Sequence, residues 1–161
     1  DSGNFKIGDA LTEGEKLTFK GIPRFSPEIF RFVNITDPSK FKQFAKGLDQ
    51  LMDEGVAQMF TKEDSNRKII GVVGALQFDV IAYRLEHEYT APCNFEPINL
   101  FKACWVKADD PKKLEEFVSR RKRDLARDKD GKLVFLSESA WTLKLVQDNF
   151  PDVKFSFSSE D

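Results

Sequence analysis

Apolar residues change their spacing within the stretch Ile69–Tyr89, and this change predicts a strand that turns sharply into a helix. Residues 69–73 form a short apolar run, as in a buried strand. Gly71, Gly74 and Ala75 suit a close approach between this strand and the helix that follows. From residue 78 onward the apolar positions recur with a helical period. They lie at Phe78, Ile81, Ala82, Leu85 and Tyr89, on one predicted face.

The residues before this connection predict a β-α-β-β-α order. Asp37 can cap a helix, Pro38 suits its first position, and Gly55 suits its end. The predicted elements are a strand at 29–35, a helix from 38 to 55, a strand at 56–61, a charged hairpin loop at 62–68, and then the strand and helix described above. With one further strand, this is a ferredoxin-like β-α-β-β-α-β half.

The residues after position 91 predict a second α/β section. Apolar groups on both faces of residues 92–107 indicate a covered strand, with Pro97 at an irregularity or an edge. Asp110 and Pro111 repeat the helix start of the first half, which suggests two β-α-β-type units in succession. The elements predicted after them are a helix at 111–128, a strand at 133–136, a helix capped by Ser139 that carries Trp141, Leu145, Val146 and Phe150, a stop at Pro151, and a strand with Val153, Phe155 and Phe157.

The pattern of apolar and polar residues at the start of the chain differs from that of the rest. Residues 5–9 and 16–19 are short alternating segments on either side of a hairpin-type turn, so they predict two strands from the end of a β-domain. Residues 21–23 mark a boundary. Because the chain opens without Met, we expect it to be a piece of a longer protein. The predicted division is residues 1–24 as strands and linker, and residues 25–161 as one α+β domain.

Composition narrows the class of protein. Of 161 residues, 40% are hydrophobic and 32% charged, which indicates a globular chain, and its 16 Phe predict a Phe-rich core. The formal charge of −2 gives no global attraction for nucleic acid or membrane, so a polyanion must meet a local basic patch. Two cysteines are too few for a disulfide framework and indicate a reducing compartment. Neither a membrane-spanning run nor a signal peptide is predicted.

Catalytic groups are hard to assemble from this sequence. His87, the single histidine, lies off the apolar stripe of its helix, and a pair with Cys93 lacks a third orienting group. A His/Cys metal site lacks enough ligands. Glycines before a helix can cradle phosphate, but no Gly-x-x-x-x-Gly-Lys-Ser/Thr or Gly-x-Gly-x-x-Gly follows, so a tight strand-to-helix connection is favoured. We therefore expect no enzyme carried wholly by this chain.

The predicted helix at 111–128 carries the most distinctive charge pattern. Its buried stripe is Leu114, Phe117, Val118 and Leu125, and Arg121 falls within that stripe and must extend out to water. Arg120, Arg123 and Arg127 fall on the opposite side, where Glu116 can pair with Arg120. Such a face can be merely solvated, or it can contact RNA phosphates through planar guanidinium groups. A second, weaker candidate is the hairpin loop with Lys62, Arg67 and Lys68.

The order of these motifs resembles a known family. Residues 71–80, Gly-Val-Val-Gly-Ala-Leu-Gln-Phe-Asp-Val, and residues 84–89, Arg-Leu-Glu-His-Glu-Tyr, look like the signature segment in the third domain of peptide chain release factor 3, the bacterial class II factors. The third domain of elongation factor G is similar more loosely. Further agreement comes from residues 7–15, like the end of the family's β-barrel second domain, from residues 21–28, like its interdomain stretch, and from residues 150–155, like its C-terminal close.

The resemblance implies a role that composition does not show. The family is a translational GTPase that binds the ribosome after peptide release and promotes dissociation of the class I release factor. GTP and Mg are held by an N-terminal domain that this chain lacks, so no catalytic residue carries over and no cofactor is expected here. The implied partners are ribosomal RNA, a small-subunit ribosomal protein, and the GTPase and β-barrel domains of the parent, with no DNA or membrane. The implied location is the cytoplasm.

Two other hypotheses remain open at this stage. A stand-alone RNA-binding ferredoxin-like module would display aromatic residues on an open sheet face, whereas most Phe here fall on buried faces by periodicity. A small α/β enzyme or ligand-binding domain would show a deep pocket with a strongly shifted carboxylate.

Overall fold

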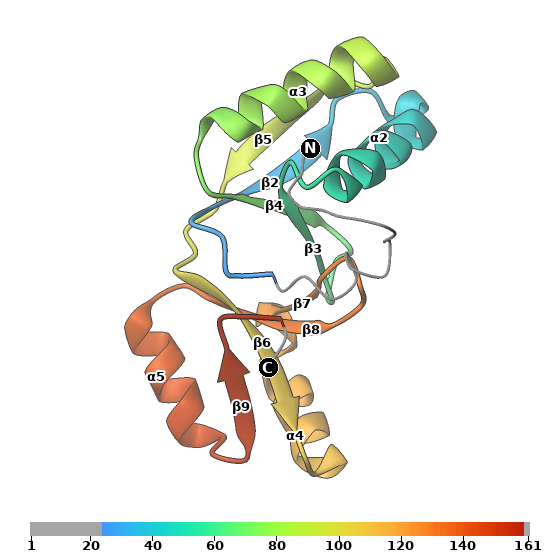
Figure 1. The fold of residues 1–161 in the computed structure, drawn as a ribbon. Coiled ribbons are helices and arrows are strands. Elements are labelled where there is room, and N and C mark those ends of the chain that lie inside the picture. The colour runs from blue at the N-terminus through green and yellow to red at the C-terminus, as the bar shows by residue number, and fades with distance from the viewer. Residues whose placement is uncertain (1–23, 160–161) are drawn as a thin grey trace, which may run out of the picture.

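The computed structural model describes residues 24–159, and the α+β class predicted from the sequence is confirmed (Figure 1). The predicted strand at Ile29–Ile35 has the same bounds in the structure. The predicted strands at residues 5–9 and 16–19 and the boundary at 21–23 lie outside the described residues. The strands are β2 (Ile29–Ile35), β3 (Gln58–Lys62), β4 (Lys68–Val72), β5 (Cys93–Pro97), β6 (Lys102–Ala108), β7 (Leu125–Arg127), β8 (Leu133–Ser137) and β9 (Val153–Ser156). The helices are α2 (Phe41–Asp53), α3 (Leu76–Tyr89), α4 (Pro111–Arg121) and α5 (Ala140–Asn149), with 3-10 turns at Pro38–Lys40 and Lys122–Asp124.

The strands of the described region form one eight-stranded sheet in the order β5-β2-β4-β3-β7-β8-β6-β9. Every neighbouring pair is antiparallel. The first half, β2-α2-β3-β4-α3-β5, and the second, β6-α4-β7-β8-α5-β9, each place their four strands in the same order, fourth-first-third-second. The predicted α/β extension is therefore a second copy of the first half's topology, joined to it through the equivalent strands β3 and β7.

Both halves open their first helix in the way the sequence predicts. Asp37 Oδ1 accepts a hydrogen bond from Ser39 N at 3.0 Å, and Asp110 Oδ1 accepts one from Lys112 N at 2.9 Å. The proline after each Asp lies in the first turn, where its missing N–H leaves no broken bond. Ser139 caps α5 in the same sense, because its Oγ accepts from Thr142 N at 3.0 Å.

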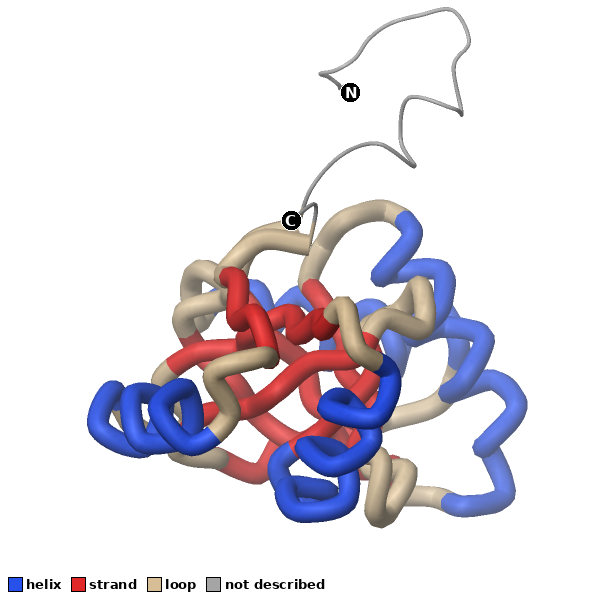
Figure 2. The backbone as a smooth tube through the Cα atoms, turned by 90° about the horizontal axis from the view of Figure 1, so that it is seen from below, coloured by secondary structure: helices blue, strands red, loops and turns tan. Residues whose placement is uncertain are grey.

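Three apolar cores hold the sheet and helices together. One lies between the first half of the sheet and helices α2 and α3, and a second lies between the other half and helices α4 and α5. The third lies on the remaining face, where the two halves of the curved sheet meet, so strands occupy the centre and helices the periphery (Figure 2). Phe60 is central to it, since its ring centroid lies 6.3 Å from those of both Phe30 and Trp105. The members of this third core are Phe30, Phe60, Ile69, Ala103, Trp105, Ala126, Val134 and Leu136.

The predicted helix at 111–128 is too long. α4 ends at Arg121, a 3-10 turn follows, and Leu125–Arg127 forms β7. Leu125 fits a helical stripe and a strand alternation equally well, so spacing could not distinguish them. Pairing with both β3 and β8 decides the matter, because it supplies partners on two sides to the backbone of β7. Arg120, Arg123 and Arg127 therefore do not share one helical face.

The segment 92–107 is also different from its prediction as one covered strand. β5 lies at the edge of the sheet beside β2, whereas β6 lies in the second half between β8 and β9. Pro97 ends β5 at that edge, in agreement with the predicted position for a residue that has no N–H to donate. Residues 98–101 carry the chain from one half to the other.

The close approach between strand and helix expected at Gly71 and Gly74 is not found at either residue, because the nearest atoms at Gly71 belong to Pro27 and Phe60 and not to α3. An added Cβ at Gly71 would lie 2.5 Å from Pro27 Cγ, but nothing lies within 4 Å of the corresponding position at Gly74. Two helices approach closely at Gly47 of α2, where an added Cβ would lie 2.7 Å from Leu85 Cδ2 of α3. Gly47 is therefore the residue that allows these two helices to pack.

Replacing Gly47 with Leu is expected to lower the free energy of unfolding by about 2–3 kcal/mol, because the new side chain must displace the α2–α3 contact. Urea unfolding measures the change. Gly74→Leu is the matched control, since its side chain enters open space and the expected change is within about 0.5 kcal/mol. Equal unfolding midpoints for the two variants would show that helix packing does not depend on Gly47.

Within residues 24–159, none of the helices combines the length and hydrophobicity required to cross a bilayer.

Candidate nucleic-acid interface

Residues from each of the two predicted basic clusters meet at the seam between the halves, namely Lys62 from one cluster and Arg123 and Arg127 from the other. Strands β3 and β7 pair there, with Thr61 opposite Arg127 and Lys62 opposite Ala126. Lys62 Nζ also donates to the carbonyl oxygen of Arg123 at 2.7 Å, although the two residues are 61 positions apart in the chain. We call the surface formed by Lys62, Lys122, Arg123 and Arg127 the basic seam. Only tertiary structure could show it, because no local pattern links residues this far apart.

The basic seam combines paired and unpaired cations. Arg127 contacts Glu63 Oε1 at 3.3 Å and donates to the carbonyl oxygen of Gly131 at 3.1 Å, while Lys62 Nζ lies 3.7 Å from Asp64. These partners are partly exposed, and ion pairs in such positions are worth little, so phosphate can replace them. Lys122 and Arg123 are exposed, and no side-chain ion pair of theirs is found within the described part of the chain.

Arg120 does not join the basic seam. It lies in the last turn of α4, where its guanidinium contacts Glu116 at 3.6 Å, as predicted, and lies 6.0 Å from the ring centroid of Phe150. Arg121 leaves the apolar stripe only in part. It pairs with Asp124 at 3.1 Å, but its Nε is buried with no hydrogen-bond partner among the described residues, and its guanidinium lies 5.8 Å from the ring centroid of the buried Phe135. The structure thus divides the predicted arginine cluster between two surfaces.

The remaining candidates, Arg67 and Lys68, make contacts within the sheet. The Arg67 guanidinium lies 3.7 Å from the ring centroid of Phe32, and its Nη2 is 2.9 Å from Glu96 Oε1. The hydrogen bond from Arg67 holds the pKa of the Glu96 carboxyl below its usual range. Lys68 Nζ donates to Thr61 Oγ1 at 2.9 Å. These two side chains tie strands together and are poorer candidates for phosphate than Arg123.

Hydrogen bonds made by the Gln77 side chain explain why the connection between β4 and α3 is a tight turn and not a phosphate loop. Gln77 Oε1 accepts the backbone N–H groups of Val73 and Gly74 at 2.9 and 2.8 Å, and Gln77 Nε2 donates to the carbonyl oxygen of Val56. The amides that would bind an anion are already satisfied by this side chain. The favoured strand-to-helix interpretation is confirmed.

The thiols and the histidine are placed apart. Burial raises the pKa of the Cys93 thiol to about 11 and that of the Cys104 thiol to about 12, so both stay protonated near neutral pH. Cys93 packs against the first core, whereas His87 is exposed on α3 and stacks on Tyr83 at 4.2 Å. No metal-binding group of His, Cys, Asp and Glu side chains is found between residues 24 and 159.

A cavity of about 870 Å³ lies where α2 ends and α3 begins. Its lining includes Glu54, whose pKa is lowered because Arg84 donates hydrogen bonds to it. An ionised, paired carboxylate is the opposite of the neutral acid or free base that the enzyme hypothesis needs. The RNA-module hypothesis requires aromatic residues on an open sheet face, but Phe30, Phe60 and Trp105 on the inner sheet face are buried between the two halves.

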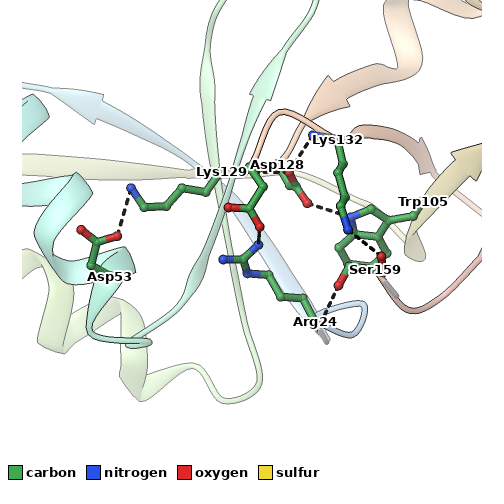
Figure 3. Close-up of polar contacts among 8 residues, drawn as sticks. Arg24, Asp53, Trp105, Asp128, Lys129, Lys132 and Ser159 are labelled. Atoms are coloured by element: carbon green, nitrogen blue, oxygen red, sulfur yellow. Dashed lines mark hydrogen bonds and ion pairs between the residues drawn. The ribbon is translucent and has the colours of Figure 1, made fainter. Parts of the chain in front are cut away.

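The sequence predicts only the end of a helix near residues 128–131. The structure has a turn at residues 128–132, in keeping with the Asp-Lys-Asp-Gly composition. Asp128 is 7% exposed, and its carboxylate accepts from Trp105 Nε1, Lys132 N and Asp130 N, each at 2.9 Å (Figure 3). Lys129 Nζ reaches Asp53 of α2 at 3.3 Å, and Asp130 contacts Arg24. This turn therefore joins the second half to the first and fixes the backbone beside the basic seam.

Comparison with known families gives one match over most of the chain. The model of the family described as "Class II release factor RF3, C-terminal domain" matches residues 19–147. The matched range includes both basic clusters, the β4–α3 connection and the turn at residues 128–132.

Proposed function

Because the chain belongs to the family of the class II release factor RF3 C-terminal domain, and so to translation termination, we propose that it is the ribosome-contacting domain of a termination GTPase. Its parent promotes recycling of the class I release factor in the cytoplasm. GTP and Mg belong to the parent's N-terminal domain, and this chain contributes no hydrolytic residue. Its partners are ribosomal RNA, a small-subunit ribosomal protein, and the parent's GTPase and β-barrel domains.

The basic seam is the observation that carries this proposal. Lys62 and Arg127 belong to the paired central strands β3 and β7, and Lys122 and Arg123 lie in the 3-10 turn that leads into β7. A phosphate backbone is recognised by cations that are fixed in place but free to exchange their partners. Arginine is well suited to this, because its guanidinium offers a planar fork of donors.

The second observation that supports the proposal is that the domain is built to be rigid. A domain that passes on the nucleotide state of a neighbouring domain must move as one body. Here one sheet runs through both halves, and three cores support it. Residues 24–26 also bind the segment that follows β9, since Ser26 N donates to Phe157 O at 3.0 Å and Ser159 N donates to Arg24 O at 2.8 Å. We therefore propose a stiff arm with a basic contact surface.

The double variant Arg123→Glu/Arg127→Glu is expected to weaken ribosome binding by about tenfold at low salt and to reduce the salt dependence by about one unit of slope for each phosphate interaction removed. Pelleting of the chain with ribosomes at rising salt measures both quantities. The reason is that each charge reversal abolishes one interaction that releases counterions and adds repulsion in its place.

Lys144→Glu is the matched control, because Lys144 is exposed on α5 and is not one of the residues of the basic seam. It should leave both affinity and slope unchanged. Urea midpoints for all variants distinguish weaker ribosome binding from impaired folding. If the double variant pellets like the unmodified chain, the basic seam is not the contact surface, and if the unmodified chain itself does not pellet, the ribosome-contact proposal for this chain fails.

A further inference from the structure

Helix α3 is apolar on two opposite faces. Phe78, Ile81 and Leu85 point into the first core. On the opposite side, Leu76, Val80 and Tyr83 follow one another at i, i+4 and i+7, and His87 continues the row and stacks on Tyr83. Leu76 is 77% exposed and Tyr83 is 64% exposed. We call this row the outer stripe of α3.

The outer stripe differs from the outward faces of the other helices. The exposed positions of α2 are largely charged, including Lys46, Asp49 and Asp53, and those of α4 are likewise polar. On α5, Trp141 and Leu145 are exposed at i and i+4, but the next position of this row, i+7, is Asp148, so the apolar row is shorter than on α3. A surface helix usually keeps one face polar, and a contiguous exposed apolar row marks an interaction surface.

Carboxylates surround the outer stripe on both flanks. Asp79 and Glu86 lie along one side of the helix, and both are exposed. On the other side, Arg84 lies between Glu54 and Glu88, at 2.6 Å and 2.9 Å respectively, so its single charge is shared by two acids. The hydrogen bonds from Arg84 lower the pKa of Glu54, which keeps this acid ionised at neutral pH. The rim is therefore net negative.

This charge pattern indicates which kind of molecule can bind to the outer stripe. A nucleic acid would meet repulsion from the acidic rim. A second copy of this chain would bring two acidic rims together, and like charges across an interface oppose association. A protein segment with apolar side chains in the middle and Lys or Arg on its flanks is complementary in both respects.

We propose that the outer stripe of α3 docks an amphipathic, basic protein segment, whose apolar residues cover Leu76, Val80 and Tyr83 and whose cations meet Asp79 and Glu86. Tyrosine is frequent among residues that dominate such interfaces, and Tyr83 lies near the middle of the row. α3 packs on α2 and on β5, the edge strand that lies three strands away from β3 of the basic seam (Figure 1). The outer stripe is therefore a second surface, and it stands whether or not the basic seam contacts RNA.

The test uses the whole chain and two synthetic helical peptides of about four turns. One carries Leu at helical spacing with Lys on both flanks, and the other has Glu in place of every Lys. Fluorescence anisotropy measures affinity, and amide chemical shifts locate the contact. The Lys peptide should shift the α3 signals and bind at least about tenfold more tightly than the Glu peptide, since only its charges complement the rim.

Val80→Ser and Tyr83→Ser should each weaken binding of the Lys peptide by about tenfold. Leu145→Ser, at an exposed leucine on α5, is the matched control and should change nothing. All three positions are exposed, and urea midpoints verify that folding is kept. Equal binding of both peptides, or equal binding of the Lys peptide to Val80→Ser and the unmodified chain, would overturn the proposal. So would a concentration-dependent dimer that Val80→Ser converts to monomer.

Discussion

Replacing Phe60 with Ala is expected to lower the free energy of unfolding by about 3–5 kcal/mol, the range measured for loss of a fully buried aromatic ring. Phe60 is 0% exposed and lies on the inner face of β3, next to the seam between the halves. Its ring contacts Phe30 from the first half and Trp105 from the second. The cavity would therefore form where the two halves hold each other, and neither half can close it without changing the curvature of the sheet.

Urea unfolding, followed by the fluorescence of Trp105 and Trp141, measures this loss. Phe41→Ala is the matched control, because the same atoms are removed from a ring that is 61% exposed at the start of α2. Its expected effect is below about 1 kcal/mol, since little apolar surface is removed from the core. Similar losses for the two variants would mean that the third core does not hold the halves together.

The second large effect is expected at Asp128. Replacing it with Asn keeps the shape of the side chain, but should lower the free energy of unfolding by about 2–4 kcal/mol. Asp128 Oδ1 accepts the backbone N–H groups of Asp130 and Lys132, and Oδ2 accepts from Trp105 Nε1. An amide cannot accept at both ends, so its NH2 group would face either the indole N–H or the two backbone donors.

A double-mutant cycle with Trp105→Phe identifies the cause. Removing the indole N–H takes away the donor that clashes with the new amide, so the loss in the double variant should be smaller than the sum of the single losses by about 1–2 kcal/mol. Unfolding in urea gives all three values. Strictly additive losses would show that the buried hydrogen bond between Trp105 and Asp128 is not what the amide disrupts. The result matters for function because this turn positions Lys129 against α2 and lies beside Arg127 of the basic seam.

Features of both halves follow from local sequence patterns. The β2 bounds, the caps at Asp37 and Asp110 and the buried face of α3 all follow from neighbours within one or two turns. These features depend on steric and hydrogen-bonding preferences that act over a few residues. The repeated Asp-Pro helix start was also a true sign of two related units, although it could not show that their strand orders agree.

The sequence predicts individual residues of the candidate site, but not that they lie together. Lys62 and Arg123 were each named from charge patterns, but nothing local indicates that Lys62 Nζ reaches the Arg123 carbonyl. Arg120 and Arg123 share a face only in the predicted helix at 111–128, whereas α4 ends at Arg121. The sequence alone does not reveal the outer stripe of α3. A helix that is apolar on two faces lacks the usual alternation of one apolar and one polar face, so spacing does not distinguish the buried face from the exposed one. The burial of each side chain in the folded protein makes this distinction.

Short-range spacing and residue type were sufficient to locate most strands and helices, the buried faces of the first-half helices, and the family that the chain resembles. Other features arise only when the whole chain is packed. Leu125 is part of a central strand because Glu63, directly after β3, donates to its carbonyl oxygen on one side and Phe135 of β8 pairs with it on the other. Phe60 and Trp105 are core residues because two half-sheets close over them, a contact that no local pattern encodes. Pairings between residues far apart in the chain depend on the summed free energy of the whole packed sheet, which local spacing does not contain.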